Sequence, residues 1–160
     1  MVNAWDVAAT TPDPELPMLT LADLGILRDV EETENGVVAT ITPTYSGCPA
    51  MREISADLKH RLESAGYDDV VVRTRLSPAW TSDWITAEGR RKLTEAGIAP
   101  PRAAPSGPVA LTLTLAAPRI PCPQCGSDDT VRTAAFSATA CKSLHRCKSC
   151  AEPFEHVKAL

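Results

Sequence analysis

Two pairs of cysteines constrain the last forty residues of the chain more than any other feature. Cys122 and Cys125 form one CxxC pair, Cys147 and Cys150 form the other, and 21 residues separate the two pairs. Each pair can direct two sulfurs at one ion, and two pairs complete the tetrahedral set of thiolates that Zn²⁺ prefers. The spacing is slightly longer than the usual zinc-finger range. The pattern predicts a four-cysteine zinc site in a small ribbon.

The apolar content of residues 119–160 leads to the same prediction. The segment holds few large apolar side chains, which are Val131, Phe136, Leu144, Phe154 and Val157. Their burial cannot offset the conformational entropy lost when about forty residues become ordered. A bound metal would supply the missing stability. Iron, as in a rubredoxin-type centre, stays open as an alternative to zinc.

Two local features accompany the cysteine pairs. Gly126 follows the first pair and permits a left-handed backbone, whereas Ala151 takes the corresponding place after the second pair. The basic residues Lys142, Arg146 and Lys148 are expected to balance the −2 charge of four thiolates around Zn²⁺. This role, and the net charge of −4 for the whole chain, argue against a general nucleic-acid binder.

The sequence divides into two units and a connector, and the fold class predicted is α+β. Residues 1–98 read as an α+β domain, 99–118 as a proline-rich linker followed by a strand, and 119–160 as the ribbon. The connector begins with "APPRAAPSGP", which holds four prolines in ten residues. It continues with the alternating pattern "VALTLTL", which is typical of a strand.

The first unit is predicted to follow the order α-β-β-α-β and then to add a third helix. A hairpin is predicted over 27–43 with Asn35-Gly36 as its two-residue turn. The clearest helix is 49–66, where Met51, Ile54, Leu58 and Leu62 recur at helical spacing before Gly66. Further elements are expected at 2–9 (helix), 68–76 (strand) and 86–98 (helix).

Cys48 stands apart from the other cysteines, in "TPTYSGCP". Pro49 suits the first position of a helix, which would place Cys48 at the N-cap. The helix end would then favour the thiolate and lower the thiol pKa. The alternative is that Cys48 replaces Ser as an ordinary cap. A Cys–His dyad is excluded within this unit, because His60 lies twelve residues further along the same helix, about 18 Å away at 1.5 Å per residue.

Three further residues are candidates for the same site. Asp13 and Glu15 in "DPELP" could join Cys48 in a metal-capable pocket, with a hydroxyl from Thr44. The alternative for the two carboxylates is an acidic turn between prolines. Cys141 is left over from the metal pairs, and is either a small buried hydrophobe or an extra ligand.

The N-terminus holds no apolar run typical of a signal peptide, and no stretch approaches the roughly 20 apolar residues of a membrane span. The expectation is a cytoplasmic protein that does not act at a membrane. In a reducing compartment six cysteines indicate metal binding or thiol chemistry rather than disulfides.

The motifs taken together resemble a known family. "DPELP", "TPTYSGCP" and "SPAWTSDWITAEGRRKL" resemble the domain of SufT-type and MIP-type iron–sulfur assembly factors. With the cysteine-rich tail added, the chain resembles the PaaD (PaaJ) family of the phenylacetyl-CoA epoxidase system. In the related assembly factors the cysteine matching Cys48 is the key functional residue, with an acidic residue of the "DPE" motif nearby.

The resemblance implies a role in phenylacetate degradation. It implies an accessory maturation protein rather than an enzyme, one that delivers an iron–sulfur or iron centre to the epoxidase and carries iron or a cluster transiently. The oxygenase and reductase subunits would be its partners, and a homodimer is possible. The alternative is a structural or electron-transfer subunit of the epoxidase complex. Phe136, Leu144 and Phe154 are expected to form the recognition surface of the tail.

Overall fold

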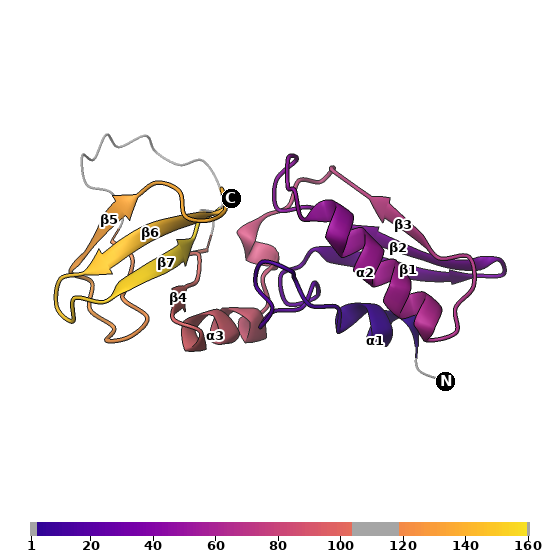
Figure 1. Cartoon of the computed structure of the whole chain (residues 1–160), viewed down its shortest axis with the longest axis horizontal. Helices are drawn as coiled ribbons and strands as arrows, with labels where there is room; N and C mark the ends of the chain where they lie inside the picture. Colours follow the sequence, from indigo (N-terminus) through magenta and orange to yellow (C-terminus); the bar gives the residue numbers. More distant parts are fainter. Residues whose placement is uncertain (1–2, 104–118, 160) are drawn as a thin grey trace. The chain divides into compact units, whose positions relative to one another are not determined.

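The computed structural model describes residues 3–103 and 119–159 in two compact units, Met1–Gly89 and Arg90–Leu160. The division falls inside helix α3 (Ala87–Glu95), which is labelled in Figure 1. The boundaries expected at 98/99 and 118/119 stay predictions. The strand expected in "VALTLTL" lies outside the described residues.

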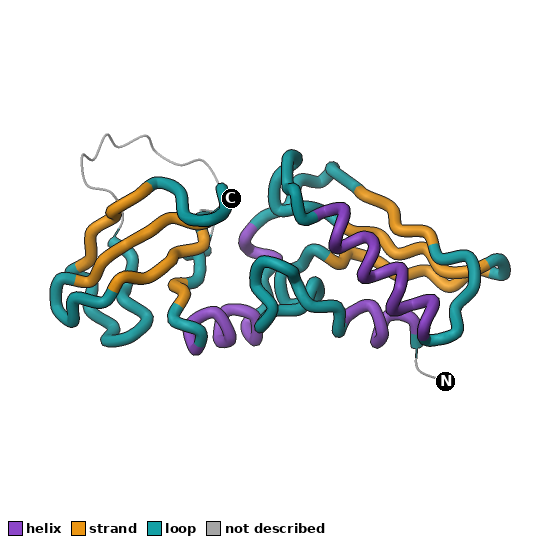
Figure 2. The backbone as a smooth tube through the Cα atoms, in the orientation of Figure 1, coloured by secondary structure: helices purple, strands orange, loops and turns teal. Residues whose placement is uncertain are grey.

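The first unit follows the predicted order α-β-β-α-β. Strand β2 (Gly36–Ile41) lies between β1 (Leu27–Thr33), to which it is antiparallel, and β3 (Val71–Thr74), to which it is parallel. Strands are drawn in orange in Figure 2. Helix α1 contacts β1 and α2, and α2 contacts β3. The α+β class is therefore confirmed. The elements are α1 (Ala4–Ala9), β1 (Leu27–Thr33), β2 (Gly36–Ile41), α2 (Met51–Ser64), β3 (Val71–Thr74) and the short 3₁₀ helix η1 (Ser82–Trp84).

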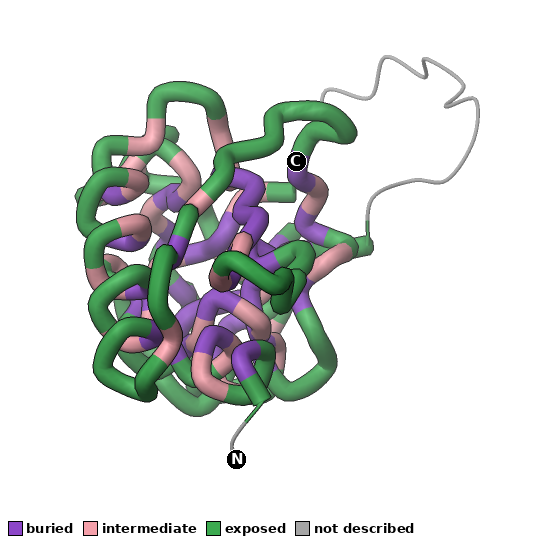
Figure 3. Tube along the Cα trace, turned by 90° about the vertical axis from the view of Figure 1, so that its right-hand side faces the viewer, coloured by how far each residue is buried: buried purple, intermediate pink, exposed green. Residues whose placement is uncertain are grey.

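The core of this unit uses the apolar positions that the sequence periodicity picks out. Along β2 the buried residues Val37, Ala39 and Ile41 alternate with less buried ones at the start of the strand. Along α2 the residues Ile54, Leu58 and Leu62 are buried, one helical turn apart. The buried positions are purple in Figure 3. Gly66 follows the C-cap Ala65 with φ +95°, as predicted for that position.

The hairpin turn differs from the prediction by one residue. Thr33 pairs with Gly36, so the turn residues are Glu34 and Asn35, and Gly36 already belongs to β2. Gly36 has φ +145°, and a Cβ there would lie 2.5 Å from the carbonyl oxygen of Asp69. The close approach of the chain before β3 therefore requires glycine at a strand position, which the Asn-Gly turn signal does not reveal.

The topology brings three loops to one end of this sheet. Leu27 at the start of β1 pairs with Ile41 at the end of β2, and Ile41 pairs with Thr74 at the end of β3. The loop before β1 therefore ends, and the loops after β2 and β3 begin, at the same end of the sheet. These loops carry "DPELP", "TYSGCP" and the two tryptophans Trp80 and Trp84.

The second unit is a four-stranded sheet in the order β4-β7-β6-β5. Strand β4 pairs with β7 in parallel, and the other neighbours are antiparallel. Residue 98 closes the expected first domain, yet in the structure Ile98 and Ala99 are strand residues of the ribbon sheet. The bounds are β4 (Ile98–Ala99), β5 (Thr130–Ala134), β6 (Lys142–Cys147) and β7 (Pro153–Val157).

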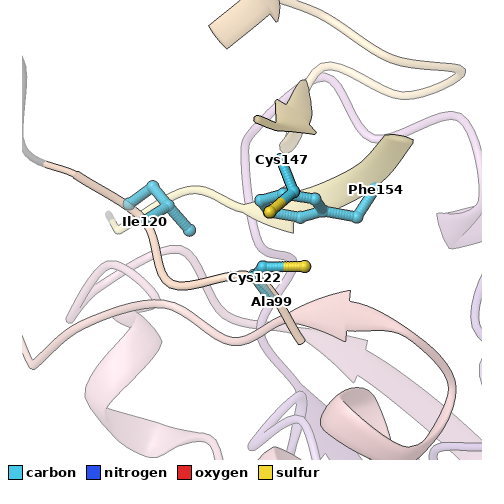
Figure 4. Close-up of a cluster of buried hydrophobic side chains, with 5 residues drawn as sticks. All are labelled: Ala99, Ile120, Cys122, Cys147 and Phe154. Carbon is cyan, nitrogen blue, oxygen red and sulfur yellow. The ribbon is translucent and has the colours of Figure 1, made fainter. Parts of the chain in front are cut away.

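A small buried cluster forms the core of the ribbon and includes two of the metal-site cysteines. Figure 4 shows its members, which are Ala99, Ile120, Cys122, Cys147 and Phe154. Phe154 is only 4% exposed, so its expected place on a recognition surface is wrong. It is buried because β7 carries it into the cluster around the sulfurs. Phe136 is 65% exposed, as a surface residue should be.

Candidate metal centre and thiol loop

The four cysteines of the two CxxC pairs meet at one point. Their sulfurs all lie within 4.8 Å of one another. Cys122 Sγ is 3.7 Å from Cys150 Sγ, and Cys125 Sγ is 3.6 Å from Cys147 Sγ. A tetrahedron with Zn–S bonds of about 2.3 Å has edges of about 3.8 Å. The sulfurs are therefore spaced as the ligands of one tetrahedral ion.

The two cysteine pairs are held by matching backbone turns. The Cys122 N–H donates to the Ser127 carbonyl at 2.9 Å, and the Cys147 N–H donates to the Glu152 carbonyl at 2.9 Å. In each turn the residue after the second cysteine is left-handed, Gly126 with φ +73° and Ala151 with φ +65°. Both turns thus fold to one geometry, although only the first uses glycine.

Backbone N–H groups and the close approach of the four thiols shift the pKa values of the cysteines. The Cys150 N–H, 3.5 Å from Cys147 Sγ, is the main cause that lowers the pKa of Cys147 to about 6. At Cys150 the Glu152 N–H acts in the same direction, but burial and the three neighbouring thiols together raise the pKa to about 12. Four thiolates this close would repel one another. A divalent metal would supply the compensating charge.

The basic residues near the second pair have other partners besides the site. Lys142 is buried and its Nζ lies 2.8 Å from a Glu155 carboxylate oxygen. Lys148 lies 3.6 Å from Asp129. The expected balance of the metal charge by these lysines is therefore shared with local carboxylates.

Cys48 lies in the loop between β2 and α2 and is half-buried. Its expected place at the N-cap of the helix is wrong, because α2 begins at Met51 and the N-cap is Ala50, whose side chain caps nothing. Pro49 and Ala50 instead form a turn in which the Met51 N–H donates to the Cys48 carbonyl at 3.4 Å. Cys48 therefore lies two residues before the N-cap Ala50.

Asp13 has a clear local task. It is only 6% exposed, and its Oδ1 accepts hydrogen bonds from the N–H groups of Glu15 at 2.9 Å and Leu16 at 2.8 Å. This is the carboxylate-capped turn that the alternative interpretation of "DPELP" describes. Glu15 and Thr44 are half-buried. Asp13 and Glu15 share their end of the sheet with Cys48 and Thr44, and a joint role for these residues stays a prediction.

The two tryptophans of the third loop have different surroundings. Trp80 is buried, and its Nε1–H donates to the Leu24 carbonyl at 2.9 Å. The Trp84 ring lies under the Arg28 guanidinium, 3.6 Å from its centroid. Trp80 is therefore a core anchor of the loop before β1.

Sequence reasoning missed one polar cluster in the ribbon. Ser143 and His145 alternate on β6, and His156 lies opposite Ser143 on β7. All three are buried. The signal available in the sequence was the alternation of polar residues on the inner face of two strands, where apolar residues are expected.

Comparisons with known proteins connect both units to described families. Residues 106–158 match the family described as "PaaD zinc beta ribbon domain", and residues 6–73 match "Iron-sulfur cluster assembly protein". A relative from Escherichia coli (strain K12), provisionally named as the D component of 1,2-phenylacetyl-CoA epoxidase, is 42% identical over 156 residues, 98% of this chain and 91% of the relative. The chain belongs to the PaaD family.

Further similarities cover the first unit of this PaaD protein. A "Fe-S protein maturation auxiliary factor" of Porphyromonas gingivalis (strain ATCC BAA-308 / W83) is 33% identical over 86 residues, 52% of the chain and 81% of the relative. The crystal structure of a "Domain of Unknown Function DUF59" from Bacillus anthracis is 27% identical with a TM-score of 0.53, covering 56% of this chain and 87% of that one. The predicted family, with its assembly-factor domain and zinc ribbon, is confirmed. Within the described residues, no helix is both long and apolar enough for a bilayer crossing.

Proposed function

We propose that this PaaD protein is an accessory factor that matures an iron–sulfur or iron centre of a phenylacetyl-CoA epoxidase. The observation that carries the proposal is the union, in one chain, of an iron–sulfur assembly domain with the PaaD ribbon. The similarity to a named epoxidase component over 98% of the chain supports the epoxidase as the protein that receives the centre. The oxygenase and reductase subunits of the epoxidase are the proposed partners.

The proposed working group of the first unit is the Cys48 thiol. It is half-buried on a loop outside the sheet, and exposed Gly47 and Pro49 flank it. The loop with Asp13 and Glu15 leads into β1 at the same end of the sheet. A thiolate and carboxylates are ligands for iron, so this end of the sheet could hold an iron or cluster cargo during transfer. Asp13 would act there mainly by fixing the turn that presents Glu15.

The proposed task of the second unit is structural. We assign zinc to its four thiolates, because the sulfur spacing fits a closed tetrahedral site with no open position for a substrate. The rigid ribbon would then dock on a client protein. No disulfide joins the cysteines of the described residues, which supports a reducing, cytoplasmic location.

The test of this proposal is the variant Cys48→Ser, with Cys141→Ser as the matched control. Both replace a half-buried thiol outside the metal cluster. In cells with the full epoxidase system, Cys48→Ser is expected to lower epoxidase activity and the iron content of the purified client at least tenfold. Its own zinc content and circular dichroism should match the parent protein. Full client iron with Cys48→Ser would refute the assignment.

The second candidate function is an electron-transfer or structural subunit of the epoxidase. The naming of the E. coli relative as part of the epoxidase favours it. Electron transfer would require iron in the four-cysteine site, because zinc has no redox chemistry. Metal analysis and a visible absorption spectrum of the purified protein decide this. A colourless protein with one zinc per chain removes the electron carrier.

A further inference from the structure

The ribbon unit contains a pocket of about 380 Å³ that does not include the metal-site cysteines. Its size lies in the range of small-molecule sites. Four cationic side chains line it, and none of its described lining residues is acidic. The cations are Arg102, Arg119, Arg132 and Lys158.

These cations have no acidic partner among the described residues. The ion pairs in the sheet of this unit join Lys142 to Glu155 and Lys148 to Asp129. A third joins Arg91 to Glu95 on α3, so none of the three involves the four cations of the pocket. Arg102 instead donates to the Arg119 carbonyl at 2.6 Å, and Lys158 donates to the Ala140 carbonyl at 2.8 Å. Neutral carbonyls leave the positive charge uncompensated. The pocket is therefore a region of positive potential that favours an anion.

Buried polar side chains form part of the pocket wall. Ser143 is 3% exposed and His156 is 8% exposed. Ser143 Oγ lies 3.0 Å from His145 Nε2 and 3.4 Å from His156 Nδ1. Ser143 Oγ also donates to the His156 carbonyl oxygen at 3.5 Å. Within the described part of the chain the buried Nε2 of His156 has no hydrogen-bond partner. This atom is fully covered, so the histidine and serine side chains stiffen the wall, and the polar contacts to a ligand come from the four cations.

We propose that this pocket binds the phosphate group of a nucleotide-sized organic anion. The guanidinium groups of the arginines match phosphate oxygens in geometry and charge. Ile120 and Val131 give the pocket an apolar lining against which a flat ring could lie. The volume exceeds what a bare phosphate needs, so the ligand carries an organic body.

The phosphate can come from a free nucleotide or from the nucleotide half of coenzyme A. Calorimetric titration of the zinc-loaded full-length protein tests both, with AMP, coenzyme A, adenosine and inorganic phosphate as probes. Saturable binding is expected for AMP or coenzyme A, and at least tenfold weaker binding for adenosine. Tenfold tighter binding of coenzyme A than of AMP would assign the site to the coenzyme, and the reverse would assign it to free nucleotides.

Charge-reversal variants connect the binding to this pocket. Arg119→Glu and Arg132→Glu change exposed residues, so the fold and the zinc content should be kept. Each is expected to weaken AMP or coenzyme A binding at least tenfold. Arg73→Glu on β3, which changes another exposed arginine, this one in the first unit, makes the same change in net charge and should bind like the parent.

Several results would overturn the proposal. They are the absence of saturable binding by any phosphate probe, equal binding of adenosine and AMP, and unchanged affinity in both reversal variants. Binding of an RNA oligomer in the absence of AMP or coenzyme A binding would assign the cations to nucleic acid instead.

Discussion

Ala151 shows how a single residue departs from the rule of its own motif. It occupies the left-handed position that Gly126 occupies in the first cysteine turn, with φ +65°. A Cβ in that region costs about 1 kcal/mol relative to glycine. The surrounding turn maintains it, because the Cys147 N–H bonds to Glu152 and the two sulfurs face a common centre.

We therefore expect Ala151→Gly to stabilise the zinc-loaded ribbon by roughly 0.5 to 1 kcal/mol, since the relief of strain exceeds the added entropy of the unfolded glycine. Gly126→Ala should destabilise it by about 1 kcal/mol. Chemical denaturation of the zinc-loaded protein measures both. Equal stability of the two variants would show that the turns do not share one geometry.

His156 predicts a pH dependence of the ribbon. Burial, followed by the charges of His145, Arg102 and Lys158, lowers its pKa to about 4 from an ordinary value of 6.5. The unfolded state thus binds a proton at a higher pH than the folded state. The stability contributed by the neutral imidazole is complete above pH 6.5 and is lost progressively as the pH falls toward about 4.

The comparison with His156→Gln isolates this effect, because both proteins carry the same four thiolates. The free energy of unfolding of the parent minus that of the variant should decrease as the pH falls from about 7 to about 4.5. A constant difference over this range would contradict the lowered pKa.

The sequence predicted the ligand residues well but local backbone geometry less well. The four cysteines were identifiable because CxxC spacing is a short-range constraint that fixes two sulfurs in one turn. The position of Cys48 relative to the helix was predicted wrongly, because a proline can start a helix or belong to the turn before it. The burial of Ser143, His145 and His156 depends on pairing between β6 and β7, which no local pattern specifies.

At the scale of elements, β6 and β7 are joined by an ion pair whose two ends differ in burial. The side chain of Lys142 is 7% exposed and that of Glu155 is 28% exposed. Burial would raise the pKa of Glu155, but its hydrogen bonds with Lys142 and Ser137 lower it overall. Removal of the carboxylate would leave a buried ammonium without its partner.

Glu155→Gln is therefore expected to destabilise the ribbon by about 2 kcal/mol at pH 7. The double variant Lys142→Met with Glu155→Gln should recover at least half of that loss, because methionine fills the lysine stem without a charge. Denaturation midpoints at constant zinc measure both proteins. A double variant less stable than Glu155→Gln alone would contradict this account.

At the scale of the whole molecule, the two units rest on different sources of stability. The first has an apolar core from β2 and α2, in which Ile54, Leu58 and Leu62 are buried. The cluster in the second contains two metal-site cysteines among its five members. Structural zinc sites contribute on the order of 10 kcal/mol or more to such folds.

Chelation of the metal should consequently unfold the second unit while the first stays folded. Amide spectra of the full chain would then lose dispersed signals from 119–159 and keep those from β1–β3 and α2. Leu58→Ala should do the opposite, destabilising the first unit by about 2 to 5 kcal/mol while zinc remains bound. Loss of both sets of signals on chelation would show that the units fold together.

The pairing of β4 with β7 connects the ribbon that holds the four-cysteine site to residues that precede Cys122 by more than twenty positions. A fragment starting at Arg119 would keep every thiolate yet leave one flank of β7 bare, and Ala99 would be missing from the packing beside Cys122 and Cys147. Such a piece would hold its ion more weakly and tend to self-associate through the open flank. A ribbon intended to stand alone should therefore begin no later than Arg90.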